Sequence, residues 1–372
     1  MKKYFVMAAL AVSTLTASAQ SVVPKWINNV KLSGFGIVQY TYNGQENNES
    51  NSFNLRLARL ALDGRAFDDW YWKAQIQFNG NTSTLGSSPK LVDLFIEWQK
   101  YDFLRVKAGQ FKNPFTYENP MHPIEQGFMS YSQVISKFAG FSDRAGAHSS
   151  NGRDIGVQLQ GDFLKNASGR NLIHYQVGVF NGQGINVKDV DQQKNIIGGA
   201  WVMPVEGMRL GAFGWIGSYA RKGTSASEGI TNTTLRRLQQ RRYAFSAEYK
   251  VDDWTFRSEY VHSTGYAFAK AMVNTNDASA KDITLSSNGD KSQGVYALVI
   301  APIIKKKCHA KARYDMYQPS KGAEKQRTQY EIGLDYYFNK NICLTGEYAY
   351  IHDRALADPN YFMIDAALSY LF

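Results

Sequence analysis

The C-terminal stretch of the chain, from Tyr361 to Phe372, alternates its apolar side chains with a period of two residues. One face carries Phe362, Ile364, Ala366, Leu368, Tyr370 and Phe372, and the other carries Met363, Asp365, Ala367, Ser369 and Leu371. Successive side chains of a strand point to opposite faces, so this stretch has one continuous apolar face. A soluble sheet edge would expose that face to water, whereas a closed barrel in lipid would cover it. The pattern therefore predicts a transmembrane β-barrel.

The N-terminal end has the features of an export signal. Met1, Lys2 and Lys3 form a basic start, and an apolar run follows from Tyr4 to Leu15. The small residues at 17–19 are typical of a cleavage site. The apolar run is too short to span a bilayer, and no later stretch supplies the roughly 20 consecutive apolar residues of a membrane helix. We therefore expect a signal peptide at residues 1–19 and a barrel domain at residues 20–372.

Alternating segments recur along the rest of the chain, with short turns on one side and long polar loops on the other, as in outer-membrane barrels. The sixteen segments are expected to begin near Val30, Phe53, Trp70, Leu91, Phe103, Asp154, Asn171, Lys194, Met208, Arg242, Asp253, Ser292, Lys305, Thr328, Asn341 and Tyr361. An even number of strands closes an antiparallel barrel. The predicted fold is therefore an all-β barrel of sixteen antiparallel transmembrane strands.

The third long loop, from Phe111 to Arg153, is the longest and is rich in apolar residues. Its aromatic and methionine side chains are Tyr117, Met121, Phe128, Met129, Tyr131, Phe138 and Phe141. A loop this apolar is a poor candidate for a solvated position, so we expect it to fold into the barrel and narrow it. Lys137 and Arg144 would then be its central cations. The alternative is a loop that lies over the rim against a neighbouring subunit.

The overall charge is positive, and the chain is rich in aromatic residues. The mean hydropathy of -0.38 is that of a soluble protein, while 14% of the residues are Phe, Trp or Tyr. A barrel reconciles the two values, because half of each strand faces water and aromatic side chains gather at the membrane interfaces. The formal charge of +10 falls to +8 when the signal and its two lysines are removed. A narrow positive lumen would favour anions. Scattered surface lysines are the alternative explanation.

Several strands place cations on the face opposite the apolar one. In the fifth strand these are Arg105 and Lys107, and in the thirteenth they are Lys307, Lys311 and Arg313. A charge that pointed into hydrocarbon near the midplane would cost about 2–4 kcal/mol, which favours an inward orientation. The alternative is a solvated wall in which carboxylates pair with these cations and no ligand binds.

The second strand needs a bulge to keep its charges on one face, since Arg56 and Arg59 are three residues apart. We place the bulge at Ala58 and Arg59, which turns Leu57 outward and the arginines inward. The predicted anion pathway then consists of Arg56, Arg59, Arg65, Arg105, Lys107, Lys307, Lys311 and Arg313, with Lys137 and Arg144 on the constriction loop.

Three motifs occur in a fixed order along the chain. They are Gly109-Gln110-Phe111-Lys112-Asn113-Pro114-Phe115, then Gly152-Arg153-Asp154-Ile155-Gly156-Val157, then Tyr175-Gln176-Val177-Gly178-Val179-Phe180-Asn181-Gly182. They resemble segments of the phosphate-selective porin O and P family. Phe53 to Gly64 is similar to the family's second strand, where Leu57 takes the second place of an arginine pair that the family often shows.

This resemblance implies a trimeric channel of sixteen strands in the outer membrane of a Gram-negative bacterium. It also implies passage of small inorganic anions such as phosphate or pyrophosphate past arginines and lysines, with outer-membrane lipid around the barrel. No cofactor is implied.

Other classes of function are disfavoured. The histidines are scattered singly, so neither a nucleophile–histidine–acid arrangement nor a metal-ligand spacing is visible, and we expect no enzyme and no metal site. The positive charge is dispersed over many strands, which argues against nucleic-acid binding. Cys308 and Cys343 lie about 10 Å apart in the predicted sheet, too far for a disulfide. The main rival is a non-selective or oligosaccharide-permeable porin, although inward aromatic residues such as Phe95 and Phe180 are few.

Overall fold

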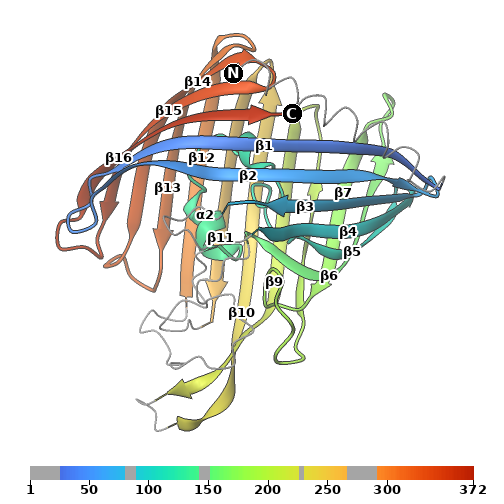
Figure 1. The fold of residues 1–372 in the computed structure, drawn as a ribbon, viewed down its shortest axis with the longest axis horizontal. Coiled ribbons are helices and arrows are strands. Elements are labelled where there is room, and N and C mark those ends of the chain that lie inside the picture. Colours follow the sequence, from blue (N-terminus) through green and yellow to red (C-terminus); the bar gives the residue numbers. More distant parts are fainter. Residues whose placement is uncertain (1–25, 80–88, 142–150, 226–229, 266–290) are drawn as a thin grey trace, which may run out of the picture.

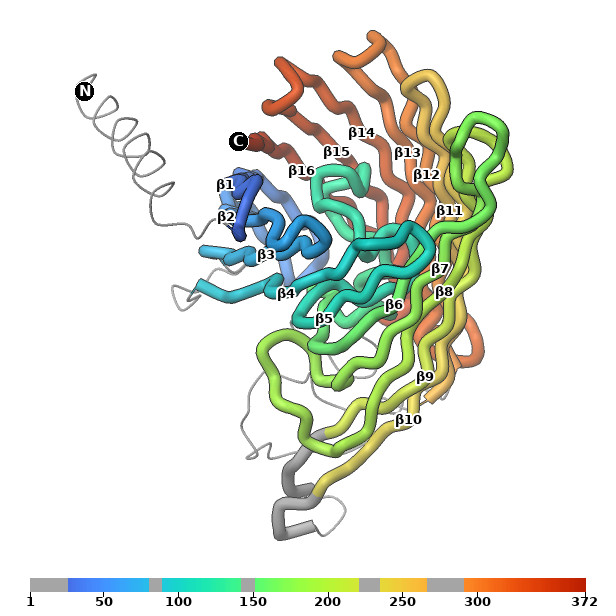
Figure 2. Tube along the Cα trace, turned by 90° about the vertical axis from the view of Figure 1, so that its right-hand side faces the viewer, coloured from blue at the N-terminus to red at the C-terminus, as the bar shows by residue number. Residues whose placement is uncertain are grey.

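The computed structural model describes residues 26–79, 89–141, 151–225, 230–265 and 291–372. Within these ranges the chain forms sixteen strands in one closed antiparallel barrel, in which each strand pairs with the next and β1 pairs with β16. Figure 1 shows the strands from the side, and Figure 2 shows β1 to β5 on one wall and β9 to β13 on the other. The predicted fold class is confirmed. The expected signal peptide lies outside the described residues.

The strands and helices have the following bounds. They are β1 (Ile27–Asn43), β2 (Ser50–Ala66), β3 (Trp70–Gln77), β4 (Lys90–Tyr101), β5 (Leu104–Lys112), the 3-10 helix η1 (Pro123–Glu125), α2 (Gln133–Phe138), β6 (Arg153–Lys165), β7 (Asn171–Phe180), β8 (Asn195–Val202), β9 (Met208–Ser225), β10 (Ile230–Val251), β11 (Trp254–Thr264), β12 (Lys291–Ile304), β13 (Cys308–Gln318), β14 (Arg327–Asn339), β15 (Ile342–Asp353) and β16 (Asn360–Leu371). Among the described residues, no helix is both long and apolar enough to cross a membrane.

The predicted strand starts agree with these bounds to within three residues, except in β10. This strand begins at Ile230, whereas the prediction was Arg242, because β9 and β10 remain paired well beyond the predicted strand. In the stretch from 235 to 242 the exposed residues are Arg237, Gln239 and Arg241, so its outer face is polar and offers no apolar row from which a membrane strand could be predicted. Figure 1 shows this hairpin extending past the other strands.

The outer face of the barrel is apolar and the inner face is polar. In β16, Phe362, Ile364 and Leu368 are exposed on the outside, while Asp365 and Ser369 are buried on the inside. Exposed aromatic residues also flank the short turns, namely Phe67, Trp70, Tyr101, Phe103, Trp254 and Phe338. An apolar band with aromatic residues at its border is typical of a barrel that spans a membrane.

The bulge in β2 occurs earlier than predicted. The register between β1 and β2 passes from Ile37 opposite Leu57 to Val38 opposite Leu55, so Arg56 is the extra residue. A bulge at this point turns Arg56 and Leu57 to the same side. Leu57 is 6% exposed and packs on the inner side, against Ile37 and its neighbours, whereas Leu55 is 62% exposed. The predicted bulge at Ala58 and the outward orientation of Leu57 are therefore wrong.

The residues between β5 and β6 form a long segment, of which 113–141 are described and are called segment 113–141 below. It contains η1 and α2, and α2 contacts β11, β12 and β13 (Figure 1). Its apolar side chains join a buried cluster with side chains of the barrel wall. That cluster contains Phe111, Phe115, Tyr117, Val134, Ile135, Phe138, Ala139, Phe180, Ile197, Phe213, Trp215, Ala244, Val261, Tyr296, Leu298 and Tyr317.

Inward aromatic residues are thus more numerous than the sequence suggested. Phe213 and Trp215 follow each other at a two-residue interval on β9, and both face inward. Tyr117 packs edge-on against Phe213, and Phe115 packs edge-on against Trp215. These rings are therefore covered by segment 113–141. Cys308 and Cys343 are both free.

Candidate functional site

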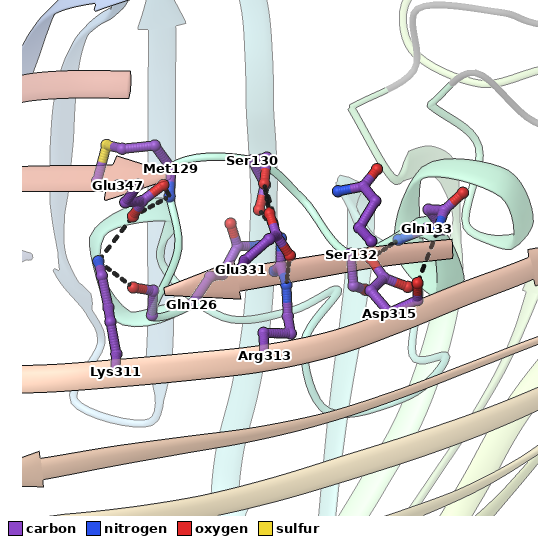
Figure 3. A network of polar contacts seen from close by, with 12 residues as sticks. Gln126, Met129, Ser130, Ser132, Gln133, Lys311, Arg313, Asp315, Glu331 and Glu347 are labelled. Atoms are coloured by element: carbon purple, nitrogen blue, oxygen red, sulfur yellow. Dashed lines mark hydrogen bonds and ion pairs between the residues drawn. The ribbon is translucent and has the colours of Figure 1, made fainter. Parts of the chain in front are cut away.

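Segment 113–141 is attached to the wall through its own backbone. The N–H groups of Tyr117 and Glu118 each donate to the Glu259 carboxylate of β11, with N–O distances of 2.8 Å. The Glu347 carboxylate of β15 accepts from the Met129 N–H at 3.0 Å, and the Asp315 carboxylate of β13 accepts from the Gln133 N–H at 2.8 Å. Figure 3 shows the contacts of Glu347 and Asp315. Wall carboxylates therefore satisfy backbone donors of a segment that has little regular structure.

Wall cations bind the carbonyl groups of the same segment. Lys311 donates to the Gly127 carbonyl at 2.6 Å and also contacts Asp335 at 2.8 Å and Glu347 at 2.7 Å. Arg313 donates to the Ser130 carbonyl at 3.1 Å and forms an ion pair with Glu331 at 2.5 Å (Figure 3). Both side chains were predicted to attract anions. Their carboxylate partners instead neutralise them, and both are buried under the segment.

Glu118 belongs to the segment itself and is completely buried. Its carboxylate accepts from the Ser132 N–H at 3.2 Å and from the Ser132 hydroxyl at 2.5 Å. Ser132 is the N-cap residue of α2. Burial raises the pKa of Glu118, although the nearby Arg313 and the Ser132 hydroxyl act in the opposite direction. This internal link holds the two halves of the segment together.

A cavity of about 380 Å³ lies between segment 113–141 and the inner faces of β1 to β7. Its lining residues are Phe35, Arg59, Tyr71, Lys73, Gln75, Asp93, Phe95, Lys107, Phe111, Lys112, Pro114, Pro120, Met121, His122, Pro123, Arg153, Gln158, Gln160 and Gln176. Five of these are cations, and Asp93 is the one carboxylate among them. The lining of the cavity therefore carries an excess of positive charge.

Two of the five cations have carboxylate partners. Arg153 forms two hydrogen bonds with Asp93, at 2.6 and 3.1 Å. Lys107 lies 3.6 Å from Glu97, just outside the cavity, and its ammonium is 5.0 Å from the centre of the Phe95 ring. The two hydrogen bonds to Asp93 leave little of the charge on Arg153 free for a ligand.

The other three cations have no carboxylate partner among the described residues. Arg59 donates to the neutral Gln77 side chain at 2.9 Å, and Lys112 donates to the Met121 carbonyl at 2.6 Å. No ion pair forms between Lys73 and any described residue, although Asp63 is its register partner on β2. Charge that is not neutralised by the protein remains available to attract anions.

His122 borders the cavity in its neutral form. Its Nδ1 accepts from the Ile124 N–H at 3.4 Å, and its ring packs edge-on against Phe35 at 4.4 Å between ring centres. Burial lowers the pKa of His122 to about 4, and the surrounding positive charges, Lys112 first, add to this effect. His122 thus adds no positive charge at neutral pH.

The remaining predicted residues are dispersed. Arg56 contacts the Met129 sulfur at 3.4 Å and the Tyr131 ring, Arg65 donates to the Asp68 carbonyl, and Arg105 is paired with Asp162 at 2.5 Å. Lys307 is exposed in the turn before β13, outside the strand on which it was predicted. Lys137 lies in the last turn of α2 with its ammonium 5.8 Å from the Tyr317 ring centre. Arg144 lies outside the described residues. The cavity brings together only Arg59 and Lys107 of the predicted set.

Sequence reasoning missed three cations of the cavity. Lys112 and Arg153 stand within motifs that were recognised, F-K-x-P-F and G-R-D, but were not considered as ligands. Lys73 shares a face with Tyr71 and Gln75 in the alternation of β3, so its inward orientation was readable from the pattern. In the described part of the chain, no three His, Cys, Asp or Glu side chains are grouped so as to hold a metal ion.

The motifs and the barrel agree with a family match. Residues 33–191 match the phosphate-selective porin O and P family. The matched stretch contains the whole cavity lining, and the resemblance drawn from the motifs is confirmed over it. No curated protein sequence matches the chain.

Solved structures share the fold at low sequence identity. An anion-selective porin from Comamonas acidovorans superposes with a TM-score of 0.62 at 12% identity, covering 92% of this chain and 99% of its own. The outer membrane channel DcaP of Acinetobacter baumannii gives 0.60 at 13% identity, covering 92% and 97%. The trimer form of Vibrio cholerae OmpT gives 0.58 at 14% identity, covering 92% and 99%. At these identities the likeness shows the fold.

The family match, the closed barrel and its apolar outer face together indicate an outer-membrane channel of a Gram-negative bacterium. Both the family match and the fold indicate a channel rather than an enzyme.

Proposed function

We propose that this protein is a channel for the passive diffusion of small anions, and that the cavity between β1–β7 and segment 113–141 forms the narrow part of its path. The observation that carries the proposal is the group of three cations, Arg59, Lys73 and Lys112, that face one cavity without carboxylate partners among the described residues. The anion-selective porin of Comamonas acidovorans, which shares the fold, supports the proposed anion channel.

The physical mechanism is a partial replacement of water around the anion. Guanidinium and ammonium groups offer charge-assisted hydrogen bonds, so an anion that enters the cavity recovers part of the hydration that it loses. Binding must stay weak, because a deep energy well would hold the ion and stop conduction. Arg59, Lys73 and Lys112 come from three strands, β2, β3 and β5, and border one cavity, where we propose that they bind a passing anion weakly.

Segment 113–141 is the proposed constriction. Its contacts run from Glu259 on β11 to Glu347 on β15, while its residues 114–123 border the cavity on the side of β1–β7. A segment that touches both walls divides the interior and leaves a narrow passage. We infer that ions pass on the side of β1–β7, since Lys311 and Arg313 on the other side are buried by the segment.

Phosphate as a permeating ion is supported by the family match alone. A homotrimer is supported by the trimer form of Vibrio cholerae OmpT, which shares the fold. We further propose that residues 1–19 are removed as a signal peptide and that residues 20–372 form the mature barrel in outer-membrane lipid.

The test is a recording from purified protein in a planar lipid bilayer under a gradient of KCl. The proposal predicts a reversal potential of the sign set by chloride permeation. A reversal potential near zero would instead support the rival, a non-selective or oligosaccharide-permeable porin. Addition of phosphate to the chloride solution then shows, through block of the chloride current, whether phosphate enters the same passage.

A further inference from the structure

The lining of the cavity is more varied than a site for a simple inorganic ion requires. Its volume of about 380 Å³ is within the range of small-molecule sites. Aromatic rings, amide side chains and cations all contribute to it. Such a combination is suited to a ligand that has both a charge and a carbon body.

The aromatic rings provide an apolar surface next to the positive charge. Phe95 packs edge-on against Phe111 with 5.9 Å between ring centres, and Tyr71 lies 6.0 Å from Phe95. The Lys107 ammonium is 5.0 Å from the Phe95 ring centre and 5.4 Å from that of Phe111. The negative faces of these rings disfavour an inorganic anion, whereas the C–H groups of an organic ligand can pack on them.

Neutral hydrogen-bonding groups lie along the adjoining strands. Gln158 donates to the Gln160 amide oxygen at 2.7 Å, and Gln160 is the register partner of Gln176 on β7. The Gln176 amide nitrogen has no hydrogen-bond partner among the described residues, although the side chain is only 7% exposed. A buried donor without an acceptor is costly, and a ligand hydroxyl or carboxylate oxygen would satisfy it.

We infer that this cavity binds hydroxylated organic anions, the class that includes sugar acids and sugar phosphates, in preference to inorganic phosphate. The cations hold the carboxylate or phosphate, the glutamine amides bind hydroxyl groups, and the rings pack against the carbon skeleton. The inference rests on the proposed anion channel and specifies its substrate class. Glucuronate and glucose 6-phosphate represent the two sources of this chemistry.

The experiment measures block of the chloride current through the full-length mature channel in a planar bilayer. Glucuronate, glucose 6-phosphate, inorganic phosphate, acetate and neutral glucose are added in turn, and the concentration that halves the current is determined for each. The inference predicts a half-blocking concentration for glucuronate or glucose 6-phosphate that is at least about fivefold below those of phosphate, acetate and glucose. The sugar anion with the lower value identifies the preferred charged group.

Two outcomes overturn the inference. One is a half-blocking concentration for phosphate equal to or below those of the sugar anions, and the other is equal block by glucose. Neither outcome affects the proposed anion channel, whose own test is the sign of the reversal potential in KCl. A cation-selective or non-selective reversal potential would remove the proposed function and this inference together.

Variants test the role of the amide. Gln176→Leu removes the donor at similar volume, so the half-blocking concentration of glucuronate should rise about fivefold while that of acetate stays unchanged. Gln293→Leu, on β12 and outside the cavity, is the matched control and should leave both values unchanged. Gln176→Asn shortens the side chain by one carbon and draws the amide back from the ligand, so it should also raise the glucuronate value, and it serves if the leucine variant does not form channels. Equal shifts in the Gln176 and Gln293 variants, or an unshifted glucuronate value in the Gln176 variants, would contradict the assignment.

Discussion

Removal of the Glu259 carboxylate should release one end of segment 113–141. Glu259 is completely buried and accepts four hydrogen bonds. Two come from the N–H groups of Tyr117 and Glu118, at 2.8 Å each, and the others come from the hydroxyls of Ser246 and Tyr296. In Glu259→Ala both backbone donors of the segment lose their acceptor.

The magnitude follows from the two bonds to the segment. A hydrogen bond to a charged group contributes about 1.5–3 kcal/mol, so the local attachment weakens by about 3–6 kcal/mol. The attachments at Glu347, Asp315 and Arg313 remain, and these hold the later part of the segment. We therefore expect the part near residues 114–123, which borders the cavity, to move while the barrel stays closed.

The assay is single-channel recording in KCl with an analysis of open-channel current noise. Glu259→Ala should increase both the conductance and the noise. Asp365→Ala is the control, because Asp365 is also a buried wall carboxylate but bonds to Gln39 and not to the segment. Circular dichroism of both variants reports whether the strands have formed. A folded Glu259→Ala channel with unchanged conductance and noise would refute the reasoning.

Three further predictions concern arginines on the barrel wall, a glycine of β5 and His122. Arg65→Gln and Arg105→Gln should shift the KCl reversal potential little, since Arg65 lies near a turn and Arg105 is paired with Asp162 at 2.5 Å; a large shift in either would place it on the ion path. Gly109→Ala should destabilise the barrel by more than about 2 kcal/mol in urea unfolding, because Gly109 has φ +134° and an added Cβ would lie 2.2 Å from the Leu94 carbonyl oxygen. Gly346→Ala, where an added Cβ meets nothing within 4 Å, is the control, and equal stability of the two would count against this account. In the folded protein the pKa of His122 is lowered to about 4, so on acidification the unfolded chain takes up a proton first. The contribution of His122 to the free energy of unfolding is therefore complete above about pH 6.5 and is lost as the pH falls towards 4. His122→Phe should make the free energy of unfolding fall less over this pH range. Identical pH dependence of the two proteins would show that His122 is not buried as described.

The fold could be predicted because one rule, apolar outside and polar inside, holds along each strand. In β16 the alternation from Phe362 to Leu368 sets the face of every side chain, and a shift by one residue would turn Asp365 into lipid. The rule fails where its physical cause is absent. It does not apply to the stretch of β10 before Arg242, which is polar and needs no lipid-facing row.

The candidate site was harder to predict, because its charges depend on partners that are distant in the sequence. Arg313 and Lys311 do face inward, but Glu331, Asp335 and Glu347 arrive from neighbouring strands and neutralise them. The alternation of these strands allows a wall in which carboxylates pair with the cations, and the strand register shows which cations they reach. The loop backbone that completes these contacts has no periodic signal in the sequence.

The bulge in β2 shows a second limit of pattern reasoning. Two positions for the extra residue keep both Arg56 and Arg59 inward, and they differ in the directions of Leu57 and Ala58. The apolar cluster of Ile37, Met129 and Ala367 decides between them, because it gives Leu57 an inner partner. One member of that cluster, Met129, comes from segment 113–141, which has no periodic signal in the sequence.

The central claim is that Arg59, Lys73 and Lys112, and not the paired cations of the opposite wall, make the channel selective for anions. The most direct measurement is the KCl reversal potential of the triple variant Arg59→Gln, Lys73→Gln and Lys112→Gln beside that of the unchanged protein. The account predicts an anion-selective potential for the unchanged protein and a value near zero or on the cation side for the variant. A folded variant that conducts with the original reversal potential would contradict it.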